Sequence, residues 1–174
     1  MRIAISGTPG SGKTIIAKLL AKKLGYKYYS IGAIRRKMAR QLGLTIEELN
    51  ELGKKKEFTD KLADEFILKQ SSNDNIIMEG RMAPLLLKKS LKIWLTTSED
   101  IARKRIFRDG LRIKDKSIEP LKRFEQDKER LKEVYGVDIS DVKFDLSIDT
   151  SDLLLEEVLE KILKYLKRYG IVVE

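Results

Sequence analysis

Residues 7 to 14 read Gly7-Thr8-Pro9-Gly10-Ser11-Gly12-Lys13-Thr14 and fit the pattern G-x-x-x-x-G-K-[ST] at every fixed position. Glycines allow such a loop to curl until successive backbone N–H groups point inward at an anion. A helix that starts directly after the loop adds its positive dipole end to the same site. The stretch therefore predicts a loop that holds the phosphates of a nucleoside triphosphate. Lys13 would reach the β- and γ-phosphates, and the Thr14 hydroxyl would ligate Mg²⁺.

The sequence on either side of this loop has the context that the motif requires. Residues 2–6 form a short apolar run, which predicts a buried strand that Gly7 ends. Apolar residues at three- and four-residue steps over 13–24 predict an amphipathic helix that Gly25 caps. We expect further strands at 27–30, 76–79, 91–95 and 144–148. We expect further helices near 34–42, after a Thr45–Glu48 capping box, and at 58–70, 98–108, 117–135 and 153–169.

Strands and helices alternate along the whole chain, which favours an α/β fold with a parallel sheet covered by helices on both faces. A length of 174 residues favours a single domain over 1–174. No run of residues is apolar for long enough to span a membrane, and we expect a soluble, cytoplasmic protein that is a monomer.

The composition excludes several kinds of chemistry. The chain has no cysteine and no histidine, so a cysteine-based zinc site, a thiol nucleophile and imidazole acid–base catalysis are all absent. The net charge of +9 is compatible with nucleic-acid binding. However, the densest basic stretch has only three lysines and is flanked by acids, so a solvated lysine-rich surface is the stronger interpretation and we expect no nucleic-acid partner.

Two arginine-bearing segments indicate a second anionic substrate. The first, Met78-Glu79-Gly80-Arg81, directly follows an expected strand, and ligands of open α/β sheets bind outside the carboxyl ends of the strands. Glu79 could organise Mg²⁺ through water, and Arg81 could bind a phosphate. A surface turn with an ion pair is the alternative interpretation of this segment.

The second segment places Arg123, Asp127 and Arg130 on one stripe of an expected helix. The stripe lies beside an apolar stripe, so it could border a cleft while the helix is anchored in the core. On spacing alone, an ordinary solvated ion-pair face is the stronger interpretation.

With these motifs together, the chain resembles the cytidylate kinases of the compact archaeal type, within the nucleoside monophosphate kinase family. The resemblance spans essentially the whole chain. It rests on the phosphate loop, Ser30-Ile31-Gly32 with Arg35-Arg36, Glu79-Gly80-Arg81, and the Arg123, Asp127 and Arg130 trio. The implied fold is a three-layer P-loop kinase with a five-stranded parallel sheet, a monophosphate-binding segment at about 31–70 and a short lid at about 109–122.

The resemblance also implies roles for single residues. ATP with Mg²⁺ would be the donor, held by Gly7, Thr8, Pro9, Gly10, Ser11, Gly12, Lys13 and Thr14, with Glu79 contacting the metal through water. The acceptor CMP, and dCMP with it, would be bound by Arg36, Gly80, Arg81, Asp127 and Arg130. Catalytic residues at the transferring phosphoryl group would be Lys13, Arg105, Arg108 and Arg123.

The chain departs from the family pattern at two positions. Bacterial relatives follow Arg81 with an aspartate that helps to read cytosine, whereas this chain has Met82. Many relatives have an acidic residue where this chain has Ser30. These departures bear on the base preference. The alternatives that remain are a kinase for AMP, UMP or dTMP, a P-loop ATPase or nucleic-acid-linked regulatory module, and a small-molecule kinase of the shikimate type. The guanine-reading motif Asn-Lys-x-Asp is absent, which argues against a GTPase.

Overall fold

The computed structural model describes residues 1–46, 48–49, 51–52, 65, 69, 74–110, 125, 128–129, 132–133 and 136–170. Within these residues, strands alternate with helices as the sequence predicts. The strands are β1 (Arg2–Gly7), β2 (Lys27–Ser30), β3 (Ile76–Glu79), β4 (Leu91–Thr96) and β5 (Leu146–Asp149). The helices are α1 (Lys13–Leu24), α2 (Ile31–Gln41), α5 (Ala83–Leu86), α6 (Glu99–Gly110), the 3₁₀ turn η1 (Ile139–Asp141) and α8 (Leu155–Lys167).

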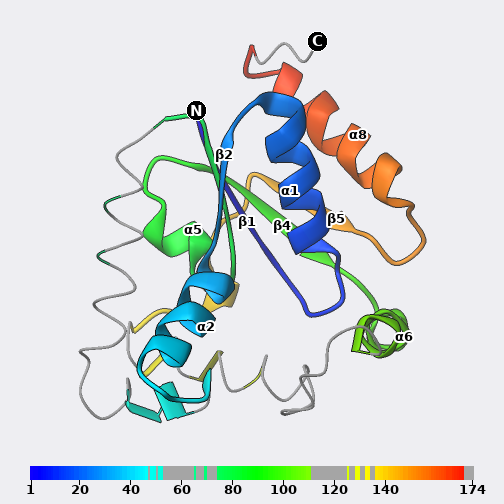
Figure 1. The fold of residues 1–174 in the computed structure, drawn as a ribbon. Coiled ribbons are helices and arrows are strands. Elements are labelled where there is room, and N and C mark those ends of the chain that lie inside the picture. Colours follow the sequence, from blue (N-terminus) through cyan, green and yellow to red (C-terminus); the bar gives the residue numbers. More distant parts are fainter. Residues whose placement is uncertain are drawn as a thin grey trace.

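The five strands form one parallel sheet in the order β2-β3-β1-β4-β5. This confirms the predicted α/β class and the five-stranded parallel sheet. β1 lies at the centre, where its backbone pairs with β3 on one side and β4 on the other. The strand order changes direction beside β1, which is where open α/β sheets bind their ligands. The turn that follows β1 lies at this position, near α2 and α6 at the lower end of the molecule in Figure 1.

The core is divided between the two faces of the sheet. Helices α1 and α8 cover one face, where Ile16, Leu20 and Ile162 are completely buried. The other face packs Met78, Met82 and Leu87 with residues of α2, α5 and η1. Helices thus cover both faces, as a buried parallel sheet requires.

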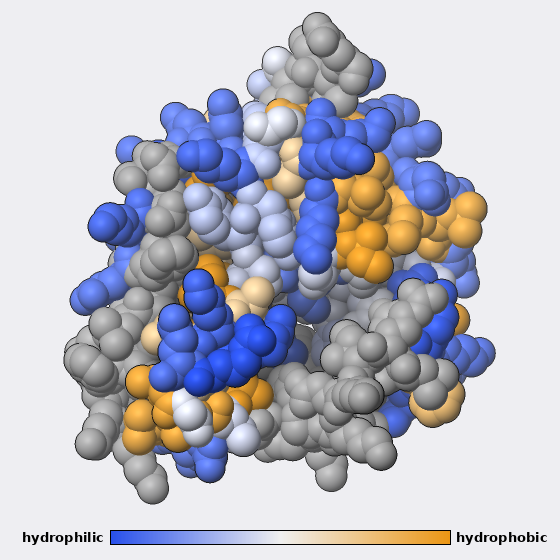
Figure 2. Space-filling model, in the orientation of Figure 1, coloured by the Kyte–Doolittle hydropathy of each residue, from blue (hydrophilic) through white to orange (hydrophobic). Residues whose placement is uncertain are grey.

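The surface above α1 and α8 carries an apolar patch, which is the large orange area in Figure 2. The exposed large apolar side chains of these two elements are Ile15 and Leu19 of α1, together with Leu154 and Leu155 at the start of α8. In the part of the chain that the structure describes, no helix is long and apolar enough to cross a membrane.

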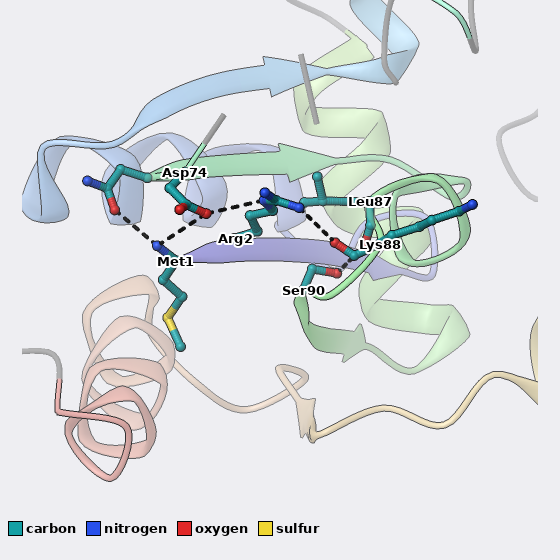
Figure 3. A network of polar contacts seen from close by, with 7 residues as sticks. Met1, Arg2, Asp74, Leu87, Lys88 and Ser90 are labelled. Atoms are coloured by element: carbon teal, nitrogen blue, oxygen red, sulfur yellow. Dashed lines mark hydrogen bonds and ion pairs between the residues drawn. The ribbon is translucent and has the colours of Figure 1, made fainter. Parts of the chain in front are cut away.

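At the amino ends of the strands, polar contacts tie the chain start to the beginning of β3 (Figure 3). The Met1 amino group donates to Asn75 Oδ1 at 3.1 Å, and Arg2 Nε lies 3.3 Å from Asp74 Oδ1. A surface pocket borders these residues, at the opposite end of the strands from the glycine-rich turn. This end of the sheet is therefore stabilised by polar contacts and takes no part in the phosphate site.

Several predicted boundaries were wrong by one to three residues, among them those of the last strand and of α2. The last strand begins at Leu146 and not at residue 144; Phe144 packs against Trp94 with tilted rings, whose centroids lie 4.9 Å apart. Helix α2 begins at Ile31, directly after β2, because the Ser30 hydroxyl caps it by accepting from Ala33 N at 3.2 Å. The Thr45–Glu48 capping box is confirmed by two reciprocal hydrogen bonds. Most of the helices predicted at 58–70 and 117–135 lies outside the described residues.

Candidate active site

The loop from Gly7 to Thr14 connects the carboxyl end of β1 with the first turn of α1. Gly7 and Gly10 have positive φ angles of +153° and +74°. A Cβ atom at Gly7 would lie 2.0 Å from the Leu95 carbonyl oxygen, and one at Gly10 would lie 2.6 Å from Ala102 Cα. These glycines are therefore required twice, by the backbone conformation and by the close approach of β4 and α6.

The start of α1 is open to an anion. Gly12 occupies the N-cap with φ +80° and provides no side-chain acceptor, and the first turn contains no acidic residue. The first N–H groups and the positive end of the helix dipole thus point into the loop. The loop is closed on the Thr8 carbonyl, which accepts from Ser11 Oγ at 2.8 Å and from Lys13 Nζ at 3.2 Å.

Lys13 lies in a half-buried and positively charged setting. The pKa of Lys13 is lowered to about 8, first by burial and then by the nearby Arg81 guanidinium, while the Glu79 carboxylate acts in the opposite direction. The three side chains are therefore electrostatic neighbours. Among the described residues, these two cations and one carboxylate leave a positive charge that phosphate groups would neutralise.

Glu79 is the last residue of β3 and is only 5% exposed. Its Oε1 accepts two hydrogen bonds from β2, at 2.5 Å from Ser30 Oγ and at 3.2 Å from Tyr28 OH. Tyr28, Ser30 and Glu79 share one face, because β2 and β3 pair with Ser30 opposite Glu79.

Burial, followed by the Glu79 carboxylate, raises the pKa of Tyr28 to about 12. The Tyr28 hydroxyl therefore keeps its proton and acts as a donor to Glu79. Lys18 of α1 lies over the Tyr28 ring, with Nζ 5.9 Å from the centroid. Tyr28 could not be predicted as a site residue, because a tyrosine in an edge strand gives no signal of a polar role until the strand order is known.

The residues of the predicted acceptor side begin directly beyond Glu79. Gly80 has φ +141° and donates its N–H to the Ile5 carbonyl at 3.0 Å, which holds the Gly80–Arg81 turn against β1. Arg36 of α2 is exposed and contributes to the electrostatics of Tyr28. Its neighbour Arg35 is 7% exposed. The described acceptor-side residues Arg36, Gly80 and Arg81 thus lie around Glu79, while Asp127 and Arg130 lie outside the described residues.

Met82 is buried at 5% exposure in the core under α5, where it is also the N-cap residue. A side chain in this position packs against apolar neighbours and presents no polar group to a ligand. The departure from the family pattern at this position is therefore a change from a polar residue to a core residue.

The arginines that were predicted to contact the phosphoryl group differ in their exposure and contacts. Arg105 is half-buried, and its guanidinium donates to backbone carbonyls of the loop at Gly10 and of Thr150 and Ser151. Arg108, one helical turn later on α6, is exposed. Arg123 lies outside the described residues. The role of these arginines at a transferring phosphoryl group stays a prediction.

The donor set fits a hydrated magnesium ion. Thr14 is exposed at the start of α1, and a hydroxyl with a carboxylate provides the hard oxygen ligands that Mg²⁺ prefers. Within the described ranges, no group of three or more acidic side chains forms a protein-only metal cage. The ion would therefore share its coordination with nucleotide phosphates and water.

The parallel sheet, the glycine loop and the basic site beyond β3 define a P-loop kinase. Solved structures of shikimate kinase share this fold. The enzyme from Acinetobacter baumannii matches with a TM-score of 0.61 at 17% identity, covering 98% of this chain and 95% of its own. The enzyme from Aquifex aeolicus matches with a TM-score of 0.60 at 21% identity, covering 98% and 99%.

Sequence comparison gives the family. The model of the cytidylate kinase-like family matches residues 2–152, and the chain belongs to this family of nucleoside monophosphate kinases. The cytidylate kinase of Sulfolobus acidocaldarius is 39% identical over 173 residues, covering 97% of this chain and 95% of that protein. The cytidylate kinase of Sulfurisphaera tokodaii is 37% identical over 171 residues, covering 95% of both.

Proposed function

We propose that this protein transfers the γ-phosphoryl group of MgATP to the phosphate of CMP, and of dCMP. The proposal rests on the proximity of three charged side chains beyond the carboxyl ends of β1 and β3, namely Lys13, Glu79 and Arg81. In this proposal the glycine loop binds the phosphates of the donor, and Arg81 with Arg36 binds the phosphate of the acceptor. Two polyanions could thus bind head to head, with the reacting phosphates between them. The cytidylate kinases that this chain resembles support the choice of acceptor.

The chemistry requires no protein base. An oxygen of the acceptor phosphate attacks the γ-phosphorus, and the bond from that phosphorus to the β-phosphate oxygen breaks, which releases ADP. The attacking oxygen is already anionic near neutral pH, so the absence of histidine is no obstacle. Catalysis comes from positioning and from stabilising charge during the transfer.

Each group of residues has a part in this reaction. The loop amides and Lys13 hold the donor phosphates, while Arg36, Gly80, Arg81 and Arg130 orient the acceptor phosphate and Asp127 its sugar. Arg108 and Arg123 stabilise the moving phosphoryl group, through the planar bidentate geometry that arginine provides. Thr14 and, through water, Glu79 would hold Mg²⁺, which neutralises phosphate charge as a Lewis acid when it is bound. The segments 31–70 and 109–122 exclude water so that ATP is not hydrolysed.

The acceptor is tested by a coupled assay for ADP release with CMP, dCMP, UMP, AMP, GMP, dTMP and shikimate offered separately. We expect turnover with CMP to exceed turnover with the other bases by at least about tenfold, which corresponds to about 1.4 kcal/mol of discrimination. A preference for another monophosphate would support a nucleoside monophosphate kinase but change the proposed base of the acceptor. ATP hydrolysis that no acceptor stimulates would overturn the proposal.

A further inference from the structure

Arg105 of α6 joins two segments that are far apart in the sequence. Its Nη1 donates to the Gly10 carbonyl at 3.3 Å and to Thr150 Oγ1 at 3.0 Å. Its Nη2 donates to the carbonyls of Thr150 at 2.7 Å and Ser151 at 3.3 Å. One guanidinium thus bridges the glycine loop after β1 and the loop after β5.

Thr150 completes the connection from the other side. It is 2% exposed, and its Oγ1 lies 3.2 Å from the Ser11 carbonyl and 2.9 Å from the Thr96 carbonyl, so these two acceptors share its single proton. Its own N–H donates to Thr96 O at 2.9 Å, which anchors the residue to β4. The carbonyls of Gly10 and Ser11, two consecutive peptide groups of the phosphate loop, are therefore both held from outside the loop.

Holding these carbonyls also fixes the amides beside them. A peptide group is planar, so its N–H points opposite to its C=O. The contact at Gly10 O orients the Ser11 N–H, which closes the turn on Thr8 O at 3.4 Å. The contact at Ser11 O orients the Gly12 N–H at the entrance of α1. Gly10 and Gly12 have φ angles of +74° and +80°. Because glycine is conformationally flexible, fixing this loop in one conformation costs more backbone entropy than for other residues.

We propose that Arg105 and Thr150 act as a clip that holds the phosphate loop in its anion-binding conformation, and that Arg105 is a positioning residue. The clip deepens the proposed function and rests on it, because it assumes that the loop binds the donor nucleotide. It gives Arg105 a different role from the direct phosphoryl contact that the family resemblance implies. It also assigns a function to Thr150, which the sequence analysis did not single out.

The test compares Arg105→Ala, Thr150→Val and the double variant. Binding of MgATP is measured by calorimetry with no acceptor present, and kcat is measured separately with CMP. Thr150→Ser keeps the hydroxyl and serves as the conservative rescue. Arg103→Ala is the matched control, because Arg103 lies on the same helix and pairs with Glu99 at 2.7 Å on an exposed surface. Thermal unfolding of each variant is recorded first, and Arg105→Lys replaces Arg105→Ala if the latter does not fold.

The clip predicts that Arg105→Ala weakens MgATP binding by about 10- to 100-fold, as expected for hydrogen bonds from a charged donor. Thr150→Val should weaken it by about tenfold. The double variant should be no more than about twofold weaker than Arg105→Ala, because both changes break one unit. Thr150→Ser and Arg103→Ala should bind like the unchanged protein, and kcat should change by less than about fivefold in every variant.

Three results would overturn the clip. One is a kcat loss of about 10³-fold in Arg105→Ala with unchanged MgATP binding, which indicates direct contact with the moving phosphoryl group. Another is independent, multiplicative losses in the double variant. The third is unchanged MgATP binding and kcat in Arg105→Ala. If the unchanged protein binds MgATP but does not phosphorylate CMP, only the proposed function fails, and the binding cycle still tests the clip.

Discussion

Ser30 Oγ donates a 2.5 Å hydrogen bond to Glu79 Oε1, and the two residues are register partners on the neighbouring strands β2 and β3. The same hydroxyl accepts from Ala33 N and caps α2. One small side chain thus joins the carboxylate of the proposed metal site to the first turn of the helix that carries Arg36.

Ser30→Ala should therefore destabilise the fold. It removes an N-cap and a donor to a buried carboxylate, which together cost about 2 to 4 kcal/mol. Urea unfolding at pH 7 measures this change in the free energy of unfolding. Ser30→Thr keeps the hydroxyl and is the control. A loss below about 0.5 kcal/mol in Ser30→Ala would show that neither contact stabilises the protein.

Tyr28→Phe should leave the fold intact and weaken the use of metal. The change removes the 3.2 Å hydrogen bond to Glu79 Oε1 and keeps the ring beneath Lys18. The Mg²⁺ concentration for half-maximal rate should rise about tenfold, as is usual when a partner of a metal-binding group is lost. Tyr29→Phe is the matched control, since Tyr29 packs against the core cluster on the other face of the sheet. Equal effects of the two changes would contradict a specific role for Tyr28.

Nucleotide binding should take up a proton at alkaline pH. The pKa of Lys13 in the free protein is about 8, lowered by burial and by Arg81, so the side chain is mostly neutral at pH 9. Bound phosphates favour the charged form, so about 0.9 proton should be taken up at pH 9 and almost none at pH 6.5. Calorimetry in buffers of different ionisation enthalpy measures this number. Lys13→Arg, which is charged throughout, should show no uptake at pH 9.

The same shift affects stability with a definite sign. Because folding lowers the pKa of Lys13 from 10.5, burial of the charge destabilises the folded protein fully below pH 8. This cost is relieved as the pH rises from about 8 toward 10.5. Lys13→Met removes the titrating group, so the free energy of unfolding should lose this residue's share of its pH dependence between about pH 8 and 10.5. An unchanged slope would mean that Lys13 does not titrate there.

Gly10→Ala should be far more damaging than Gly25→Ala. Both glycines have positive φ, so each alanine strains the backbone by about 1 kcal/mol. At Gly10 the new methyl group would also lie 2.6 Å from the Ala102 backbone, whereas at Gly25 it meets nothing within 4 Å. Urea unfolding should show an extra loss of about 1 to 3 kcal/mol for Gly10→Ala, with MgATP binding abolished. Similar losses in the two variants would contradict the close packing of α6 against the loop.

Donor and acceptor residues should separate kinetically. Lys13→Ala should abolish turnover, whereas Arg81→Ala and Arg130→Ala should mainly impair the use of CMP. Loss of an arginine–phosphate contact should raise the KM for CMP by about 10- to 100-fold. Steady-state kinetics with each substrate varied in turn makes the distinction. Unchanged KM and kcat in Arg130→Ala would refute its role at the acceptor.

Much of the fold followed from local pattern. The glycine loop, the five apolar strands and the stop at Gly25 depend on residues close together in the sequence, and the structure confirms them. The start of α2 was missed because Ser30 serves both as the last residue of β2 and as the cap of the helix. Periodicity alone could not show that one residue has both roles.

The polar contacts within the site were harder to predict, because they depend on strand order. Tyr28 reaches Glu79 only because β2 pairs with β3, and 51 residues separate the two in the chain. Thr150 reaches the Ser11 carbonyl across 139 residues. A motif identifies the group that touches a ligand, but not the distant side chains that hold the group in place.

The direct passage from β2 into α2 has a consequence for how the binding of one ligand changes the affinity for another. In the described part of the chain β2 is an edge strand that pairs with β3, and Ser30 connects α2 with Glu79 through its helix cap and its hydrogen bond. We expect that a ligand that displaces Arg36 on α2 acts through Ser30 on the Glu79 carboxylate. Such a linkage is reciprocal. If bound acceptor increases the affinity for the metal by some factor, bound metal increases the affinity for the acceptor by the same factor. Titrations of each in the presence of the other would then give the same factor.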